Sequence, residues 1–202
     1  MVIDEKQGYA SGRARREQIV AEATILFGKV GFHGATILDI AAQCHISRAG
    51  LLHHFPTKES LLEAVLEERD REDIARFRQN GSRGTDGLGI LRGMVDLASH
   101  NSKRAGIIEL YAVLSAESTA PEHPAHAYFV ERYDRIRSGT VRALERARAA
   151  GYLKADVDVG DAAIELTALM DGLQVQWLLS PEAVDMPAQL QKRIQQLLTV
   201  EL

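Results

Sequence analysis

Four side chains with strong hydrogen-bond donors gather in one short stretch of the chain: Arg48, His53, His54 and Lys58. Their N–H groups can donate to phosphate oxygens or to the edges of bases. A catalytic pair is not indicated, because His53 and His54 are adjacent on a predicted helix and point about 100° apart. The donors therefore indicate binding of a polyanion rather than catalysis.

Two short helices joined by a tight turn must position these donors. An apolar stripe with helical spacing predicts the first helix over 37–44, and Thr36 is a suitable N-cap for it. His45 and Ile46 form the turn, Ser47 caps the second helix, and Pro56 stops it. This is the pattern of a helix-turn-helix, whose second helix enters the major groove of DNA.

The sequence around this motif resembles one known family without a gap in spacing. The matching residues are Asp39-Ile40-Ala41-Ala42, Ile46-Ser47-Arg48, Leu51, and His54-Phe55-Pro56-Thr57-Lys58-Glu59-Ser60-Leu61-Leu62. This run resembles the TetR (tetracycline-repressor-like) family of transcriptional regulators, and the similarity covers roughly residues 13–66. It implies a homodimeric, cytoplasmic regulator, most simply a repressor that a small hydrophobic molecule releases from a palindromic operator in double-stranded DNA.

The resemblance and the residue types together give a set of expected DNA contacts. The set is Thr36, Ser47, Arg48, Ala49, Gly50, Leu52, His53, His54 and Lys58. Arg48 is expected at a base edge, most simply a guanine, and Gly50 permits close approach of the backbone. Thr36, Ser47, His53, His54 and Lys58 are expected to hold phosphates.

Three positions depart from the family pattern. His45 stands where a glycine is usual, so its backbone is expected to be left-handed. Gly50 stands where a larger residue is common. Leu52 replaces a frequent tyrosine, and it could pack on a thymine methyl but cannot donate to a phosphate.

Length and composition define the class of protein. The chain has 202 residues, of which 46% are hydrophobic and 26% charged, with one cysteine and a net charge of −4. Helical spacing dominates, which predicts an all-α fold of about nine helices. No apolar run is long enough for a membrane span and no signal core is present, so a cytoplasmic protein without membrane contact is expected.

The predicted domains differ in charge. Residues 1–12 are expected to be a disordered tail, 13–58 the helix-turn-helix domain, and 59–202 a helical domain for ligand binding and dimerisation. Residues 1–58 hold seven Lys and Arg against five Asp and Glu, whereas 59–202 hold 17 against 23. A mildly basic head on an acidic body suits local binding of a phosphate backbone.

Several polar groups allow two interpretations. Arg13, Arg15 and Arg16 either contact DNA or form a solvated helix start. The run EERDRED at 67–73 and the arginines of a long helix after Pro124 are both typical of a solvated face. His123 and His126 with Glu122 could bind a metal, but a role at a helix start is favoured and no metal or cofactor is expected.

The body is expected to hold a ligand cavity and a dimer interface. The resemblance implies a cavity between helices, with candidate residues Met94, Leu97, His100, Tyr111, Leu114, Tyr128, Met170, Leu173, Gln174 and Trp177. A predicted helix over 159–179 is apolar on nearly every side, so a partner subunit is expected to cover one face. The candidate interface residues are Ile164, Ala168, Trp177, Leu190, Ile194 and Leu197.

One alternative function belongs to a different class. The chain could be an all-α ligand-binding protein or an enzyme, with a helix-turn-helix that only packs. The sequence holds no HExxH motif, zinc-finger cysteine set or dinucleotide glycine motif. Since no catalytic constellation is present either, the protein is not expected to be an enzyme, and Cys44 on the apolar stripe is expected in the core.

Overall fold

The computed structural model describes residues 5–80 and 86–202, and this part of the chain is built from helices, which confirms the all-α prediction. The helices are α1 (Glu5–Gly34), α2 (Ile37–Gln43), α3 (Arg48–His54), α4 (Lys58–Asn80), α5 (Leu88–Asn101), α6 (Ala105–Glu117), α7 (His126–Ala149), α8 (Val159–Leu179) and α9 (Met186–Leu197). None of the described helices is both long and apolar enough to cross a lipid bilayer.

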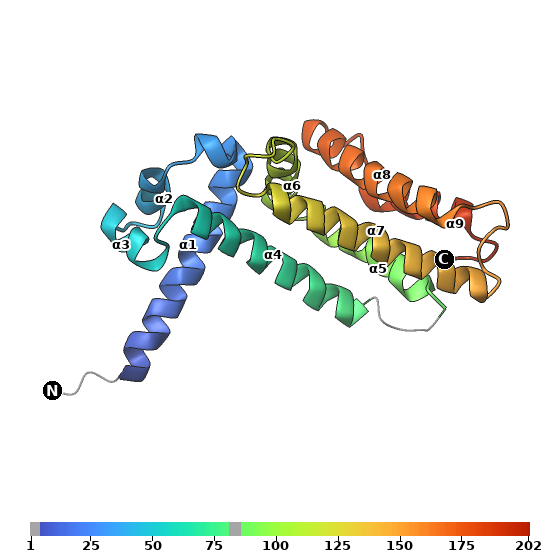
Figure 1. Ribbon diagram of the computed structural model, residues 1–202, viewed down its shortest axis with the longest axis horizontal. Coiled ribbons are helices and arrows are strands. Elements are labelled where there is room, and N and C mark those ends of the chain that lie inside the picture. The colour runs from blue at the N-terminus through green and yellow to red at the C-terminus, as the bar shows by residue number, and fades with distance from the viewer. Residues whose placement is uncertain (1–4, 81–85) are drawn as a thin grey trace.

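The helices form a small head and a larger body (Figure 1). The head consists of α1, α2 and α3, and the body consists of α5 to α9. Helix α4 starts in the head and runs along the body, while the C-terminus lies at the end of the body away from the head. A shift of α4 or of the elements beside α1 would therefore move the recognition motif relative to the body.

One hydrophobic cluster joins the head to the body. Phe27, Leu51 and Phe55 are fully buried in the head, and the same cluster continues through Leu110 of α6 to Phe129 of α7. The predicted boundary at residue 58 thus divides the motif from the body in sequence, but it does not divide two separate cores. Cys44 is also fully buried in this cluster, as predicted, and burial raises the pKa of its thiol.

A second cluster lies at the far end of the body, between α5, α7, α8 and α9. It contains Leu190, Ile194 and Leu197, which are 1%, 0% and 4% exposed. The sequence predicts these three residues at a dimer interface, but the structure buries them within one chain. The stripe that they form on α9 packs on α5 of the same chain. These side chains are therefore already buried in the monomer and are not available to a partner subunit.

The N-terminal tail also differs from the prediction. Helix α1 begins at Glu5, whereas the sequence predicts disorder through residue 12; residues 1–4 of that tail lie outside the described residues. Residues 5–12 contain no proline that would interrupt a helix continuing from residue 13. The predicted end at Gly31 is confirmed, because the backbone leaves helical geometry there, with φ 73° and ψ 177°.

The turn of the helix-turn-helix contains a strained residue, as predicted. His45 has φ 54°, and among the described residues no other non-glycine residue has a positive φ. A left-handed conformation costs an L-residue roughly 1–2 kcal/mol. Glycine at this position would remove the strain, although glycine also gains more entropy in the unfolded chain.

We predict that His45→Gly raises the free energy of unfolding by about 0.5–1 kcal/mol, because relief of strain exceeds the added chain entropy. His53→Gly is the matched control: the same substitution inside α3 should lower stability by about 0.5–1 kcal/mol. Urea denaturation of both variants measures the two effects. A shift in the same direction for both would contradict the strain at His45.

Candidate functional site

Side-chain caps hold the two helices of the motif in place. Thr36 Oγ1 accepts from the backbone N–H of Asp39 at 3.1 Å, and Ser47 Oγ accepts from the N–H of Gly50 at 3.0 Å. In the turn, the N–H groups of His45 and Ile46 donate to the carbonyls of Ala42 and Ala41, each at 3.0 Å. Both predicted N-caps are confirmed, and the turn fixes α3 relative to α2.

The outer face of α3 carries the predicted donors. Arg48, Ala49 and His53 are exposed, and His54 is half-buried, whereas Leu51 points into the core. The chain holds no acidic residue between Asp39 and Glu59. The face therefore offers donors and small side chains without a carboxylate that would repel a phosphate.

Two members of this face have local constraints that the sequence did not reveal. A Cβ at Gly50 would lie 3.3 Å from Ser47 Oγ, so the small residue also leaves room for the cap. Burial lowers the pKa of His54, and the neighbouring His53, Arg16 and Arg15 lower it further. At neutral pH His54 thus offers a neutral N–H donor rather than a cation.

Two arginines of α1 bind the ends of the two helices of the motif. Arg15 Nη1 donates to the carbonyl of Cys44 at 3.4 Å, and Arg16 Nη1 donates to the carbonyl of His54 at 3.3 Å. Both carbonyls lie at helix C-termini, where a cation is favourable. Arg15 and Arg16 therefore stabilise the ends of α2 and α3, a role that neither sequence interpretation included.

Lys58 also has an unpredicted internal role. Its Nζ donates to the carbonyls of Phe32 and Ala35, at 2.9 and 3.0 Å, and lies 4.2 Å from the centre of the Phe32 ring. The sequence predicts that Lys58 holds a phosphate. Because an ammonium has three N–H donors, one remains for that contact, and the main role of Lys58 in the structure is to fix the end of α1.

In the part of the chain that the structure describes, the residues predicted to line the ligand cavity do not all belong to one cluster. Seven of the ten candidates belong to or pack on different hydrophobic clusters: Leu114 and Tyr111 belong to the first, Met94 packs on the second, and Leu173 belongs to a third between α6, α8 and the start of α9. Leu97, His100 and Gln174 belong to none of the three clusters. The helical spacing identified the candidates as inward-facing, but inward-facing residues fill the core when the helices pack closely.

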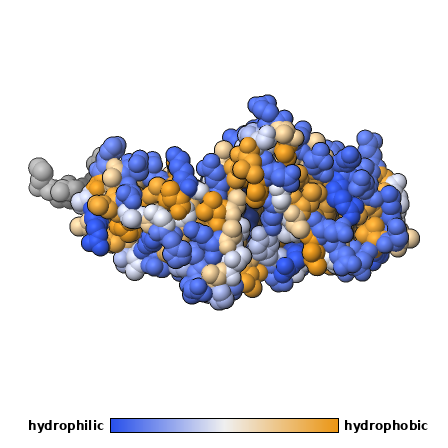
Figure 2. Space-filling model, turned by 90° about the horizontal axis from the view of Figure 1, so that it is seen from above, coloured by the Kyte–Doolittle hydropathy of each residue, from blue (hydrophilic) through white to orange (hydrophobic). Residues whose placement is uncertain are grey.

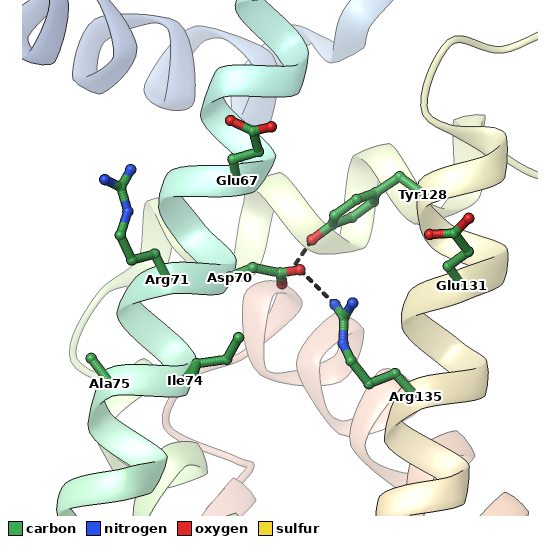
Figure 3. Close-up of a pocket in the computed structure, with 8 residues that line it drawn as sticks. All are labelled: Glu67, Asp70, Arg71, Ile74, Ala75, Tyr128, Glu131 and Arg135. Carbon is green, nitrogen blue, oxygen red and sulfur yellow. Dashed lines mark hydrogen bonds and ion pairs between the residues drawn. The ribbon is translucent and has the colours of Figure 1, made fainter.

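A different hollow lies between α4 and α7 (Figure 3). It encloses about 480 Å³ and is lined by Glu67, Asp70, Arg71, Ile74, Ala75, Tyr128, Glu131 and Arg135. Tyr128 is the residue that it shares with the predicted cavity. The lining combines an aromatic ring and an apolar patch with charged groups of both signs.

Asp70 links the two walls of this hollow. Tyr128 Oη donates to its carboxylate at 2.9 Å, and Arg132 and Arg135 of α7 form ion pairs with it. Figure 3 shows the Asp70 carboxylate pointing from α4 toward Tyr128 and Arg135. A molecule that enters the hollow would compete for these contacts and so act directly on the separation of α4 and α7.

A buried ion pair continues this network along α4. Arg69 and Asp73 are 3% and 8% exposed and pair with each other, and Arg69 also donates to Asn101 of α5 at 2.9 Å. The prediction that the run 67–73 is a solvated face is therefore wrong for these two residues. Burial raises the pKa of Asp73 above its ordinary value, and Arg69 and Arg132 offset part of this increase.

Helix α8 carries an exposed apolar stripe. Ile164, Ala168, Val175 and Leu179 follow at helical spacing and are all exposed, with Leu179 at 81%. Figure 2 shows hydrophobic residues at the surface on the side of the molecule that α8 occupies in Figure 1. An apolar face of this kind is typical of a surface that another chain covers. Trp177, which the sequence predicts at the dimer interface, is half-buried on the opposite side of α8, where it packs on the cluster that contains Leu173 and Met186.

Two family models match this chain, one over the head and one over the body. Residues 19–65 match the family model for bacterial regulatory proteins of the TetR family, and residues 91–199 match the model for the C-terminal domain of BetI-type transcriptional repressors. The chain belongs to the TetR family. It is a DNA-binding transcriptional regulator, and the alternative of a merely structural helix-turn-helix is not favoured.

Individual relatives agree with this assignment. The regulator TtgR of Pseudomonas putida is 28% identical over 192 residues, covering 88% of this chain and 86% of TtgR, and the probable regulator ArpR of the same species matches equally. Among solved structures, a putative regulator from Saccharomonospora viridis in complex with choline has a TM-score of 0.79 at 23% identity, covering 92% of this chain and 98% of that one.

A second solved structure has the same fold. SmeT of Stenotrophomonas maltophilia, in complex with triclosan, has a TM-score of 0.74 at 20% identity, covering 91% of this chain and 89% of SmeT. At this level of identity the structures show that the fold is shared. The binding site of this chain is therefore described from its own residues and not from those of the two solved structures.

We predict that Asp73→Ala lowers the free energy of unfolding by about 2–4 kcal/mol, because it leaves Arg69 buried without its closest carboxylate. Glu68→Ala is the control, since the Glu68–Arg71 pair on the same helix is exposed and should contribute less than about 0.5 kcal/mol. Urea unfolding measures both. Equal effects would contradict a structural role for the buried pair.

Proposed function

We propose that the chain acts as a homodimeric repressor that binds a palindromic operator through α3 and leaves it when a small molecule binds the body. Such a protein acts in the cytoplasm, where it meets its operator. The observation that carries the proposal is the capped α2–α3 pair, with an exposed face of donors that contains no carboxylate.

Each residue predicted to contact DNA has a proposed role. Arg48 lies at the start of α3, where a recognition helix meets base edges, and it contacts a guanine. Leu52 packs on a thymine methyl. Ala49 and Gly50 let the backbone approach the DNA, while Thr36, Ser47, His53, His54 and the third N–H of Lys58 hold phosphates.

We predict that Arg48→Ala weakens binding to the selected operator by about 1–3 kcal/mol and relaxes the preference at one base pair of each half-site. The operator is the duplex that the wild-type protein enriches from a random pool. Arg142→Ala, an exposed arginine on α7, is the control and should bind as the wild type does. Fluorescence anisotropy measures the affinities; an unchanged base preference would reject the role of Arg48.

The dimer is proposed to form through α8. Its stripe of Ile164, Ala168, Val175 and Leu179 is exposed, whereas Trp177 faces the interior of the body and is not part of the proposed interface. Two copies related by a two-fold axis would bury this stripe against itself. Such a dimer presents two α3 helices to two half-sites, separated by one helical turn of DNA or a multiple of it.

We predict that Val175→Asp converts the dimer to a monomer at micromolar concentration, because a charge would lie in the apolar contact. Val130→Asp on α7 is matched to it, since Val130 is 55% exposed and Val175 48%. Sedimentation equilibrium distinguishes the two variants. A dimeric Val175→Asp protein would exclude this face as the interface.

The effector is proposed to bind in the hollow between α4 and α7. Two proteins of the same fold are found in complex with small molecules, choline in one and triclosan in the other. In this chain the hollow combines Tyr128 and Ile74 with charged groups, which suits a molecule with an apolar body and a polar end. Its entry would compete for the partners of Asp70 and thus move α4.

A further inference from the structure

The head and the body meet at a break in α1. Gly31 has φ 73° and ψ 177°, a conformation that L-residues rarely adopt, and α2 begins only a few residues later. Upstream of the break, α1 lies against α6: a Cβ at Gly28 would come within 3.1 Å of the backbone nitrogen of Leu110. In Figure 1, α6 lies beside the upper end of α1. The direction in which the chain leaves this contact therefore sets the position of α2 and α3.

Glu117, the last residue of α6, holds the chain directly after the break. Its Oε2 accepts a hydrogen bond from the backbone N–H of Phe32 at 2.7 Å. The same carboxylate fills the space that a Cβ at Gly31 would occupy, so glycine and carboxylate fit each other. A hydrogen bond to an ionised acceptor is strong and directional, which distinguishes this contact from the apolar packing around it.

A buried histidine of the loop between α6 and α7 lies next to Glu117. His123 is 4% exposed, and its Nδ1 accepts from the backbone N–H of Ala125 at 3.1 Å. Because a backbone N–H can only donate, the ring proton lies on Nε2, which faces Glu117 Oε2 at 3.6 Å. The His123 ring also lies edge-on to the Phe32 ring, with centroids 5.3 Å apart.

The other face of Phe32 is held by α4. Lys58 at the start of α4 donates to the carbonyl of Phe32, while Glu117 accepts from its N–H. The backbone of Phe32 is thus held from two sides: α4 binds its carbonyl through Lys58, and α6 binds its N–H through Glu117. Phe32 itself is 3% exposed and cannot shift without moving both.

We propose that Glu117 is a positioning residue that sets the angle at which each head leaves the body, and thereby the spacing between the two recognition helices of the dimer. Apolar packing keeps the head attached, and the hydrogen bond from Phe32 to Glu117 fixes its direction at the glycine. Loss of the carboxylate frees a hinge at Gly31. This inference rests on the proposed function, because spacing matters only for a dimer that reads two half-sites.

The experiment compares affinity for the selected palindrome with affinity for two altered duplexes, in which the half-sites are one base pair closer or one base pair farther apart. One base pair displaces a half-site by about 3.4 Å and rotates it by about 35°. We expect the wild type to prefer the selected spacing by at least about tenfold. Glu117→Ala should reduce this preference to about threefold or less, because a freed head adapts to the altered duplexes.

Two further variants make the result specific. Glu117→Gln keeps an oxygen that accepts from Phe32 and should retain most of the preference. Glu117→Asp is shorter by one methylene, loses the contact, and should behave as Glu117→Ala does; it replaces the alanine variant if that protein does not fold. Glu122→Ala, an exposed glutamate in the neighbouring loop, is the control and should leave the preference unchanged.

The outcomes are separable. If Glu117→Ala and Glu117→Asp lower affinity for all three duplexes by the same factor, Glu117 only stabilises the fold and the inference is rejected. The same holds if their preference equals that of the wild type. If the wild type selects and binds no duplex, the proposed function fails, and the inference fails with it.

Discussion

The apolar cluster shared by head and body is the constraint on which the rest of the structure depends. Phe27 of α1, Leu51 of α3 and Leu114 of α6 belong to this one buried set, so the head stays attached to the body and apolar packing limits how far its angle can change. Close packing of this kind makes interiors resist small deformations and favours a few discrete arrangements. Movement in the body can therefore reach the DNA-binding surface only as a shift of whole helices.

Two polar networks lie where such a shift would act. The partners of Asp70 connect α4 with α7 beside the hollow, and Arg69, which pairs with Asp73 on α4, connects α4 with α5 through its hydrogen bond to Asn101. At the other end of α4, Lys58 binds the same residue that Glu117 holds from α6. The hollow and the head contact thus lie at two separate places on one helix, the middle of α4 and its first residue, so a shift of α4 would act on both.

Much of the head could be predicted because its signals are local. Caps such as Thr36 and Ser47 are recognised from their own type and the residues that follow, and the structure shows both hydrogen bonds. The body was harder, because an apolar stripe shows that a face is buried but not by which chain. The stripe of α9 was therefore assigned to a partner, although Leu190 and Ile194 pack on α5 of the same chain. Glu117 could not have been found, since its partner Phe32 lies 85 positions away.

The central claim is that a two-fold dimer of this chain reads DNA through α3, and selection of binding sites from a random duplex pool at two salt concentrations tests it most directly. The account predicts one enriched palindrome whose affinity falls as salt rises, because phosphate contacts release counterions. The selection is repeated with protein that has been unfolded and refolded to remove any bound ligand. Failure to enrich a palindrome with both preparations would contradict the claim.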